Sequence, residues 1–396
     1  MTFHENKLAE PHCPHTESSD LPPIVFLAAV PFKSYLSGRT RRLAEALAVR
    51  GHRITFAEMP SMRQVVRPTT WLRRSFGTSA GIQVVRLPPL PWRIRVSWPQ
   101  VAAQWTHYTS RLLGHLVPDL GRSVVVTSTP WWLPVVKELP AAVRCYDYLD
   151  HVEVQAGPSR IEAFQKWDDE LLGLSRLVTT VSEPLRRQLA TRCSADLVHL
   201  LPNGVCSEWI ESSTLPTNRR NLTPRPEKPI AGFLGAVFEW VDVELIAEVS
   251  RRLPDMEFVI VGPTRRGLSI NRLRGLPNIR YHNPVPFEKV PAIVGAFDVC
   301  LIPFKRNLIS EYADPLKVYE YCALGKPVVS TVLFNAGGPE PPISVAASPD
   351  AFADAIRAAL AEPALERMRR IDFARQHTWE SRSEQFVAMA TACIQS

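Results

Sequence analysis

Short apolar runs that alternate with helical segments restrict this chain to a few folds. Residues 24–30 (IVFLAAV) form a continuous apolar run. Residues 39–51 (RTRRLAEALAVRG) then place Leu43 and Leu47 at helical spacing before a terminal glycine. The sequence RITFAE follows as a second strand. A strand, a helix and a strand in this order form a βαβ unit, which predicts a parallel sheet covered by helices.

The same alternation occurs in both halves of the chain. Strand-like runs recur as GIQVVRL, SVVVTST, VRCYDYL, RLVTTVS and LVHLLP, and from residue 230 as AGFLGA, EFVIVG, NIRYH, DVCLIPF and PVVSTV. At 396 residues the chain is long enough for two domains. We predict a disordered lead at 1–22, a Rossmann-like domain at 23–205, a proline-rich linker at 206–229, a second Rossmann-like domain at 230–375 and a C-terminal helix at 376–396.

The cysteines and the N-terminal lead give no sign of a metal centre. The lead contains His4, His12, Cys13 and His15, but no second cluster with ligand spacing completes a site, so we expect a solvated tail. The seven cysteines are scattered without a CxxC pair, which argues against a disulfide framework or a zinc site. No apolar run reaches the roughly 20 residues that span a bilayer, and the start lacks a signal-peptide core, so we expect a cytoplasmic protein.

Residues 311–330 (EYADPLKVYEYCALGKPVVS) predict a short helix followed by a buried strand. Asp314 is a suitable N-cap and Gly325 ends the helix. Lys317 and Glu320 are three residues apart and therefore share one face. A helix start with a lysine favours phosphate, and a glutamate one turn deeper can accept hydrogen bonds from a diol. A nucleoside diphosphate offers both groups; the alternative is a surface helix with an intrahelical ion pair.

This stretch resembles the nucleotide-binding signature of GT-B glycosyltransferases. Three more stretches match in the order that such domains use: IAGFLGAVFEWVDVELI (230–246), MEFVIVGP (256–263) and PNIRYHNPVPFEKVPAIVGAFDVCLIPF (277–304). The chain is similar to family 4-like bacterial transferases (glycosyl transferases group 1) and to glucuronosyltransferases of exopolysaccharide synthesis. The N-terminal half matches only loosely. The resemblance implies an α/β GT-B fold, with two facing Rossmann-like domains, a cleft between them, and a C-terminal helix packed back on the N-terminal domain.

The resemblance also implies which residues bind the donor. In this family the glutamate holds the ribose, which gives that role to Glu320 and the phosphate contact to Lys317. The other nucleotide-sugar contacts implied are Asp314, Leu316, Gly235, Val285 and Arg265. Gly235 follows a strand and would let the backbone approach phosphates, although an ordinary turn glycine is the alternative. Such enzymes usually need no metal, because cationic groups offset the charge of the leaving diphosphate, so no cofactor is expected.

Two features depart from the family pattern. Many family 4 enzymes carry an arginine and a lysine just after the glycine, where this chain has VFEW at 237–240. A second cation therefore comes from elsewhere or is absent, and the candidates after strand ends are Arg265, Arg266, Lys305 and Arg306. The family's paired glutamates lie eight residues apart, but here Tyr312 takes the first place and Glu311 is one residue off. The identity of the donor sugar is therefore left open.

A general base is expected in the N-terminal domain. The sequence YDYLDHVEV places Asp147, Asp150 and His151 after a strand, where a carboxylate would deprotonate an acceptor hydroxyl as it attacks the anomeric carbon. The exopolysaccharide enzymes invert and use an aspartate here, which favours Asp150 and Asp147. A retaining reaction would need no such base, and helix capping by the two aspartates is the alternative. The acidic run WDDE at 167–170 lies in a predicted helix and indicates a solvated face.

The positive charge of the chain is concentrated in one region. The net charge is +7, and residues 59–118 contain eight arginines and no acidic residue. Tryptophans alternate there with arginines: Trp71, Trp92, Trp98 and Trp105 with Arg73, Arg74, Arg93 and Arg95. Such a region suits the anionic inner face of a membrane, or alternatively an acceptor site for a soluble acidic or glycosidic substrate. Nothing resembles a nucleic-acid-binding module.

We therefore predict a glycosyltransferase of the hexosyltransferase type (EC 2.4). It would move a sugar from a nucleotide-sugar donor, UDP-linked by resemblance, to a hydroxyl of a lipid-linked or cell-surface glycan or a small glycoside. Two alternatives remain: a catalytically silent GT-B protein that supports a partner, and a GT-B sugar-nucleotide epimerase. The first would not need Asp147 and Asp150, and the second would turn over its donor without an acceptor.

Overall fold

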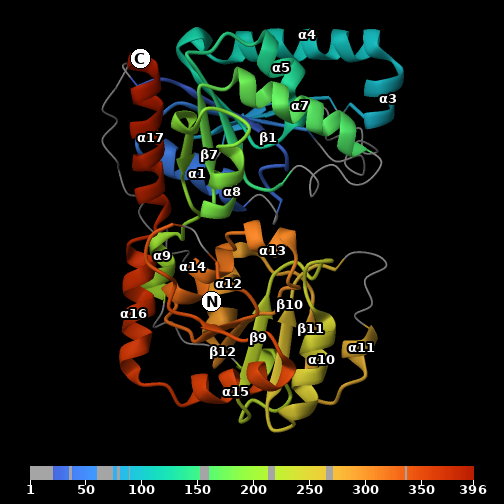
Figure 1. The fold of residues 1–396 in the computed structure, drawn as a ribbon, viewed down its shortest axis with the longest axis vertical. Coiled ribbons are helices and arrows are strands. Elements are labelled where there is room, and N and C mark those ends of the chain that lie inside the picture. The colour runs from blue at the N-terminus through green and yellow to red at the C-terminus, as the bar shows by residue number, and fades with distance from the viewer. Residues whose placement is uncertain are drawn as a thin grey trace, which may run out of the picture.

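Two α/β domains, one above the other in Figure 1, make up the computed structural model. It describes residues 21–34, 38–59, 75–77, 81–88, 90–151, 160–212, 219–264, 271–334 and 337–396. All but the last two residues of the predicted disordered lead lie outside this part of the chain. In the described part each domain is built on one sheet with helices packed against it.

The N-terminal domain contains an eight-stranded sheet of order β3-β4-β2-β1-β5-β6-β7-β8. All its neighbouring strands pair in parallel except β3 and β4. Its strands are β1 (Ile24–Ala28), β2 (Ile54–Glu58), β3 (Ser75–Gly77), β4 (Gln83–Arg86), β5 (Val124–Thr127), β6 (Val143–Tyr148), β7 (Leu177–Thr180) and β8 (Val198–Leu200). Its α-helices are α1 (Gly38–Val49), α3 (Trp92–Ser97), α4 (Pro99–Leu116), α5 (Leu133–Glu138), α7 (Ile161–Leu174) and α8 (Glu183–Leu189).

The C-terminal domain contains a six-stranded parallel sheet of order β11-β10-β9-β12-β13-β14. Its strands are β9 (Ile230–Leu234), β10 (Glu257–Val261), β11 (Ile279–His282), β12 (Val299–Ile302), β13 (Val328–Ser330) and β14 (Ser344–Val345). The helices after the first sheet are α9 (Ser207–Glu211), α10 (Val243–Arg252), α11 (Asn271–Arg274), α12 (Val290–Gly295), α13 (Leu308–Tyr312), α14 (Leu316–Ala323), α15 (Pro349–Leu360), α16 (Ala364–Arg375) and α17 (Trp379–Gln395).

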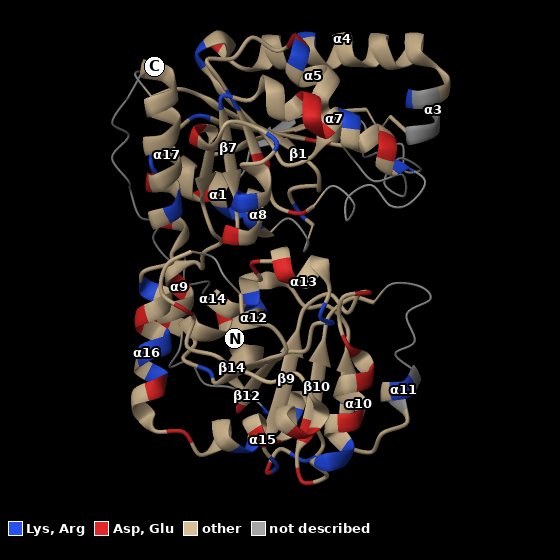
Figure 2. Ribbon diagram, viewed as in Figure 1, with Lys and Arg blue, Asp and Glu red and all other residues tan. Residues whose placement is uncertain are grey.

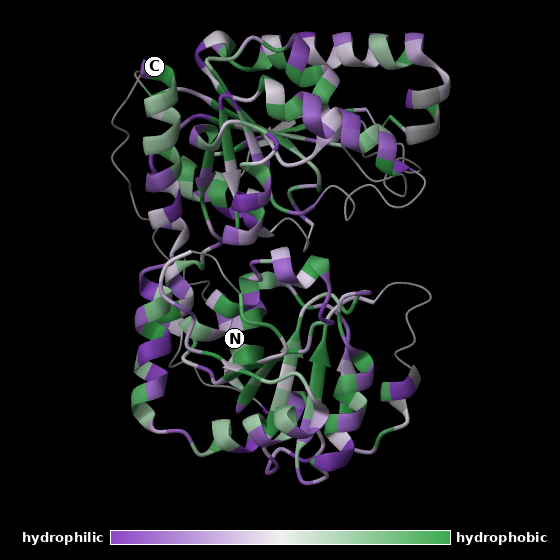
Figure 3. Cartoon of the chain, in the orientation of Figure 1, coloured by the Kyte–Doolittle hydropathy of each residue, from purple (hydrophilic) through white to green (hydrophobic). Residues whose placement is uncertain are grey.

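The central strands are continuous apolar runs because helices cover both faces of a parallel sheet. Every residue of β1, β2 and β10 is buried. In Figure 3 the strand β10 is correspondingly green. Gly232 in β9 allows close packing, since a Cβ there would lie 2.1 Å from the ring of Phe297. The alternation of strand and helix in the sequence therefore identified the architecture correctly.

The last two helices connect the domains along one side of the molecule, one above the other in Figure 1. Helix α16 packs on α14 in the C-terminal domain, and α17 packs on α1 in the N-terminal domain. Trp379, Phe386 and Ala390 of α17 are buried in the core that contains β1. The region expected to be a linker, 206–229, includes helix α9, whose Trp209 is buried against Phe287 with ring centroids 5.1 Å apart. Burying the large apolar surface of a tryptophan side chain stabilises the fold, which favours a packed helix over a solvated linker here.

Candidate functional site

A cavity of about 300 Å³ lies between the two domains. One wall is Ser34 and the first turns of α1, and the other is formed by α14 and the loops after β9, β10 and β11. Ligands collect at the carboxyl ends of strands in such sheets. The ionisable side chains among its described lining residues are Arg41, Arg42, Lys317 and Glu320.

Helix α14 presents Lys317 and Glu320 to this cavity, as the sequence predicted. Burial lowers the pKa of Lys317, an effect that Glu320 partly offsets. Burial raises the pKa of Glu320, against the opposing charges of Lys317 and Arg42. No ion pair within 4.0 Å joins the two side chains among the described contacts, so the alternative of an intrahelical ion pair is wrong.

The loop after β9 lies directly against Lys317. A Cβ on Gly235 would be 2.2 Å from Lys317 Cε and 2.5 Å from its Nζ. A Cβ on Gly262 would in turn be 2.0 Å from the carbonyl oxygen of Gly235. Both glycines line the cavity. A glycine is therefore required at position 235 because another group lies too close for a Cβ atom. In this structure that group is the Lys317 side chain and not a phosphate.

The other predicted donor-binding residues are placed differently. Leu316 and Val285 line the cavity, whereas Arg265 and Arg266 lie outside the described residues. Lys305 and Arg306 are exposed and are not among the lining residues. Lys305 and Arg306, two of the four candidates for a second phosphate-binding cation, therefore do not supply it to this cavity.

Asp314 does not cap α14 as predicted, because its carboxylate is committed to other donors. The helix begins at Leu316, and its N-cap residue is Pro315. The Asp314 carboxylate accepts hydrogen bonds from the Asn203 backbone N–H (2.6 Å) and from the Tyr319 hydroxyl (2.8 Å). Burial raises its pKa to about 6. Asp314 thus holds α14 against the N-terminal domain and does not line the cavity.

Two cationic residues of the cavity, Arg41 and Arg42 of α1, were not predicted from the sequence. Both pair with Glu45, with distances of 2.8 Å from Arg41 Nε and 2.6 Å from Arg42 Nη1. The Arg42 guanidinium also lies 3.7 Å from the ring centroid of Phe287, in the C-terminal domain. The arginines were visible in the sequence, but nothing in one helix indicates which domain it will face.

The two predicted catalytic aspartates occupy different surroundings. Asp147 is 2% exposed and accepts two hydrogen bonds from Arg39, at 3.0 and 2.9 Å, and one from the Thr179 hydroxyl at 2.8 Å. Arg39 also donates to Asn203 Oδ1 at 3.1 Å. Asp147 therefore holds the first turn of α1 in place, and it is not among the cavity's lining residues.

Asp150 lies beyond the end of β6 and is exposed to solvent. The surrounding protein nevertheless raises its pKa by desolvation. The neighbouring His151 ring stacks on Tyr312 of α13, with centroids 5.9 Å apart and planes 14° apart. This contact joins the end of β6 to the C-terminal domain. Asp150 directly precedes this contact in the chain, and it is not among the cavity's lining residues.

Two surface predictions are wrong in part. In the acidic run 167–170, Asp168 is buried and accepts hydrogen bonds from Tyr146 and Arg192, both at 2.6 Å, so this is no solvated face. In the Arg/Trp-rich region, Arg95 is 6% exposed and lies 4.5 Å from the Trp131 ring centroid.

Trp105, another member of that region, is buried and stacks on Trp132 at 6.0 Å. Trp98 is 63% exposed. The side chains of the remaining named members, Trp71, Trp92, Arg73, Arg74 and Arg93, are outside the description. Large apolar side chains of a half-covered helix favour the core, which is why Trp105 is buried while Trp98 is exposed.

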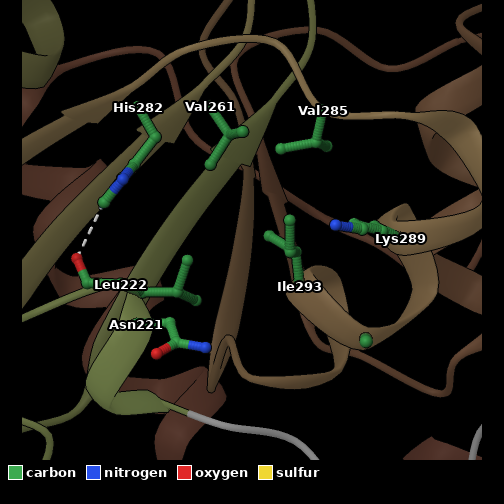
Figure 4. Close-up of a pocket in the computed structure, with 8 residues that line it drawn as sticks. Asn221, Leu222, Val261, His282, Val285, Lys289 and Ile293 are labelled. Carbon is green, nitrogen blue, oxygen red and sulfur yellow. Dashed lines mark hydrogen bonds between the residues drawn. The ribbon is translucent and has the colours of Figure 1, made fainter.

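A second cavity, of about 330 Å³, lies within the C-terminal domain and shares Val261 and Val285 with the first. Figure 4 shows Val285 and Ile293 pointing into it and Lys289 reaching in from α12's side. His282 closes one edge by donating from Nε2 to the Leu222 carbonyl oxygen at 2.8 Å. Most of its lining residues are apolar, in contrast to the charged side chains of the first cavity.

Among the residues that the structure describes, no cluster of three His, Cys, Asp or Glu side chains could hold a metal ion. None of the described helices has both the length and the apolar character needed to cross a membrane.

Comparison with known proteins agrees with the fold and with the C-terminal signature. Residues 228–362 match the family model described as glycosyl transferases group 1. A teichuronic acid biosynthesis glycosyltransferase of Bacillus subtilis, TuaH, is 31% identical over 160 residues, which cover 39% of this chain and 40% of that relative's length. The resemblance of the C-terminal motifs to glycosyl transferases group 1 is thereby confirmed.

Solved structures of the same fold cover nearly the whole chain. Sucrose-phosphate synthase from Thermosynechococcus elongatus has a TM-score of 0.70 at 17% identity, covering 95% of this chain and 100% of that one. HepE of Anabaena, solved in complex with UDP-glucose, has a TM-score of 0.65 at 13% identity, covering 93% and 99%. The predicted two-domain α/β fold, GT-B, is confirmed.

Proposed function

We propose that this chain, a GT-B protein whose C-terminal domain carries the group 1 glycosyl transferase signature, transfers a sugar from a nucleotide-sugar donor to an acceptor hydroxyl. The observation that supports this most directly is the cavity between the domains, where strand ends, Lys317 and Glu320 meet. A cation at the carboxyl ends of parallel strands suits a diphosphate, and a carboxylate suits a ribose diol. The activity of the whole chain is inferred from this site and from relatives that match it in part.

The donor would lie along the C-terminal wall of the cavity. We place its diphosphate beside Lys317 and the Gly235 loop, and the ribose hydroxyls against Glu320. The base would lie at the apolar end near Val285, where the second cavity begins. UDP is the first nucleotide to test, because the HepE and S. aureus TarM structures contain UDP-glucose and UDP, respectively.

For the chemical step we propose Asp150 as the general base. The acceptor hydroxyl would give its proton to the carboxylate of Asp150 while its oxygen forms the new bond to the anomeric carbon. The bond between that carbon and the donor's phosphate oxygen would break, and a nucleoside diphosphate would leave. A base of this kind typically accelerates such a step by about 10²- to 10⁴-fold. We assign Asp147 instead to positioning, since Arg39 and Thr179 already occupy its oxygens.

The cationic side chains of the cavity would offset the charge of the leaving diphosphate, so the proposal includes no metal ion or other cofactor. Turnover should accordingly survive dialysis against EDTA. A loss of activity that added Mg²⁺ or Mn²⁺ restores would replace this part of the proposal with a metal-assisted step.

The finer identity of the acceptor and the cellular location are also proposals. Exposed apolar side chains gather on α3 and α4, where Ile94, Trp98, Val101 and Tyr108 are 37–63% exposed. Figure 2 shows α4 largely without charge. We propose that this strip, on a cytoplasmic protein, touches the inner face of a membrane and brings the cavity to a lipid-linked acceptor. W98A should reduce sedimentation with phosphatidylglycerol vesicles, and equal sedimentation of W98A and wild type would count against it.

Calorimetry tests the central proposal. Wild-type protein is titrated with UDP, GDP, ADP, CDP and dTDP, and K317A is titrated with whichever nucleotide binds. We expect one nucleotide to bind and K317A to lose about 10- to 100-fold in affinity, since hydrogen bonds to charged groups contribute about 1.5–3 kcal/mol. If the intact protein binds none of the five, the transferase proposal fails.

A further inference from the structure

We propose that Arg41 and Arg42 of α1 form a diphosphate clamp, preorganised by Glu45, through which the N-terminal domain binds the leaving group of the donor. The inference rests on the proposed function and adds to it a binding element from the other domain. It assigns to α1 the second cation that the loop after β9 does not supply, because that loop continues with Val237, Phe238, Glu239 and Trp240.

One carboxylate holds both guanidinium groups in place. Glu45 Oε1 accepts from Arg41 Nε at 2.8 Å, and Glu45 Oε2 accepts from Arg42 Nη1 at 2.6 Å. These are the only hydrogen bonds of the two side chains in the described part of the structure. Each guanidinium therefore keeps N–H donors available while its position is fixed. Arginine presents five donors in a rigid fork, which suits phosphate oxygens.

Aromatic rings fix the two guanidinium groups from their other sides. The Arg42 guanidinium carbon lies 3.7 Å from the centroid of Phe287, which belongs to the C-terminal domain. The Arg41 guanidinium carbon lies 4.9 Å from the centroid of Phe32, beside β1. Stacking of this kind orients a guanidinium without using its in-plane N–H donors. Phe287 also lines the cavity, so Arg42 is held at the boundary between the domains.

The balance of charge in the cavity favours this role. Lys317 and Glu320 on the C-terminal wall bring one positive and one negative charge, which leave no excess for an anion. Arg41 and Arg42 add two positive charges, and Glu45 compensates one of them. A diphosphate carries at least two negative charges and would be undercompensated by Lys317 alone. The excess positive charge at the site therefore comes from the N-terminal domain.

A purely structural role for the two arginines predicts different behaviour. Arg41–Glu45 and Arg42–Glu45 are helical pairs at i,i+4 and i,i+3, which normally add little stability. If stabilising α1 were their whole role, removing either would slightly lower the melting temperature and leave nucleotide affinity unchanged. Arg50 provides the matched control. It directly follows the same helix, its Nη1 pairs with Glu384 Oε1 at a distance of 2.8 Å, and it is not among the residues that line the cavity.

The test is calorimetric titration of wild type, R41A, R42A and R50A with the nucleoside diphosphate that binds the wild type, at 0.05 and 0.5 M salt. We expect R41A and R42A each to weaken binding roughly 10- to 100-fold at low salt. The salt dependence of binding should also decrease, because a screened attraction has been removed. R50A should bind like wild type, and all variants should keep cooperative melting.

Other results overturn the clamp. If the wild type binds a nucleoside diphosphate and both R41A and R42A bind it equally well, the clamp is wrong and the proposed function stands. If R50A loses as much affinity as R41A and R42A, the effect comes from α1 as a helix and the clamp is also wrong. If the wild type binds none of the five diphosphates, the clamp and the proposed function fail together.

Discussion

Helices α1 and α14 face one cavity from different domains and hold their charges in different ways. On α14, Lys317 and Glu320 are half-buried without an ion pair between them among the described contacts, and the protein displaces the pKa of each toward its neutral form. On α1, Arg41 and Arg42 share one carboxylate on the same helix. The difference indicates that α14 is arranged to gain charge compensation from a ligand, whereas α1 is arranged to hold permanent charges in position.

The same two helices are also anchored differently at their first turns. Arg39 of α1 is paired with the buried carboxylate of Asp147. The carboxylate of Asp314, just before α14, is hydrogen-bonded by uncharged donors. Asn203 contacts both anchors, because its side-chain oxygen accepts from Arg39 and its backbone N–H donates to Asp314. One anchor is thus a charge pair and the other a buried carboxyl group whose ionisation is costly.

The largest effect should come from a residue on neither helix. D150N should lower kcat by about 10²- to 10⁴-fold, because the acceptor loses its base, and should leave the affinity for the nucleoside diphosphate unchanged. Steady-state kinetics and calorimetry measure the two quantities. D196N, at an exposed aspartate of the same domain, is the control. A D150N enzyme with normal kcat would contradict the proposal that Asp150 acts as the base while α1 and α14 bind the nucleotide.

Breaking the charged anchor should cost more stability than breaking the uncharged one. D147N leaves Arg39 buried without a compensating charge, and removing one partner of a buried pair typically costs about 3–5 kcal/mol. The free energy of unfolding by urea, followed by tryptophan fluorescence, measures the loss. D314N is the matched variant, since the amide oxygen can still accept from the Asn203 N–H while the amide NH2 group donates to the hydroxyl oxygen of Tyr319. If D314N is destabilised as much as D147N, the contrast between the anchors is incorrect.

The contribution of Asp314 to the free energy of unfolding should instead depend on pH. The pKa of Asp314 is about 6 in the folded protein and near 3.8 in the unfolded chain. Between these values the folded state binds more protons than the unfolded state, so stability should fall as pH rises from about 4 to 6 and then level off. A shift of about two units corresponds to about 3 kcal/mol.

The measurement for Asp314 is the difference in unfolding free energy between wild type and D314N across this range, which cancels other titrating groups. We expect wild type to lose stability relative to D314N with rising pH. A constant difference would show that Asp314 ionises equally easily in both states.

The sequence predicts the C-terminal side of the site far better than the N-terminal side. Lys317 and Glu320 lie three residues apart on one helix, so their shared orientation follows from helical periodicity alone. Arg42 faces the same cavity because α1 packs beside Phe287, which is 245 positions away in the chain. The burial of Asp147 likewise depends on Arg39, which comes from another element. Local patterns determine the strands and helices, but charges that meet across two domains require the assembled fold.

The smallest expected effect is that of E320Q on nucleotide binding, and it distinguishes the role of Glu320 from that of the cationic residues. E320Q should weaken binding of the nucleoside diphosphate about fivefold to tenfold, because a carboxylate makes a stronger hydrogen bond to a hydroxyl than an amide oxygen does. The loss is modest because the amide still accepts one bond and Lys317 is released from its neighbouring negative charge. Calorimetry with the intact nucleotide and its 2′,3′-dideoxy analogue measures this contribution.

Wild type should prefer the intact nucleotide over the dideoxy analogue, and E320Q should bind the two nearly equally. R42A should keep the wild-type preference, since it acts on phosphate and not on the diol. This pattern would assign the ribose to α14 and the additional phosphate contact to α1. If E320Q instead retains the full preference for the diol, Glu320 does not hold the ribose, and the two helices would then share a single role in binding phosphate.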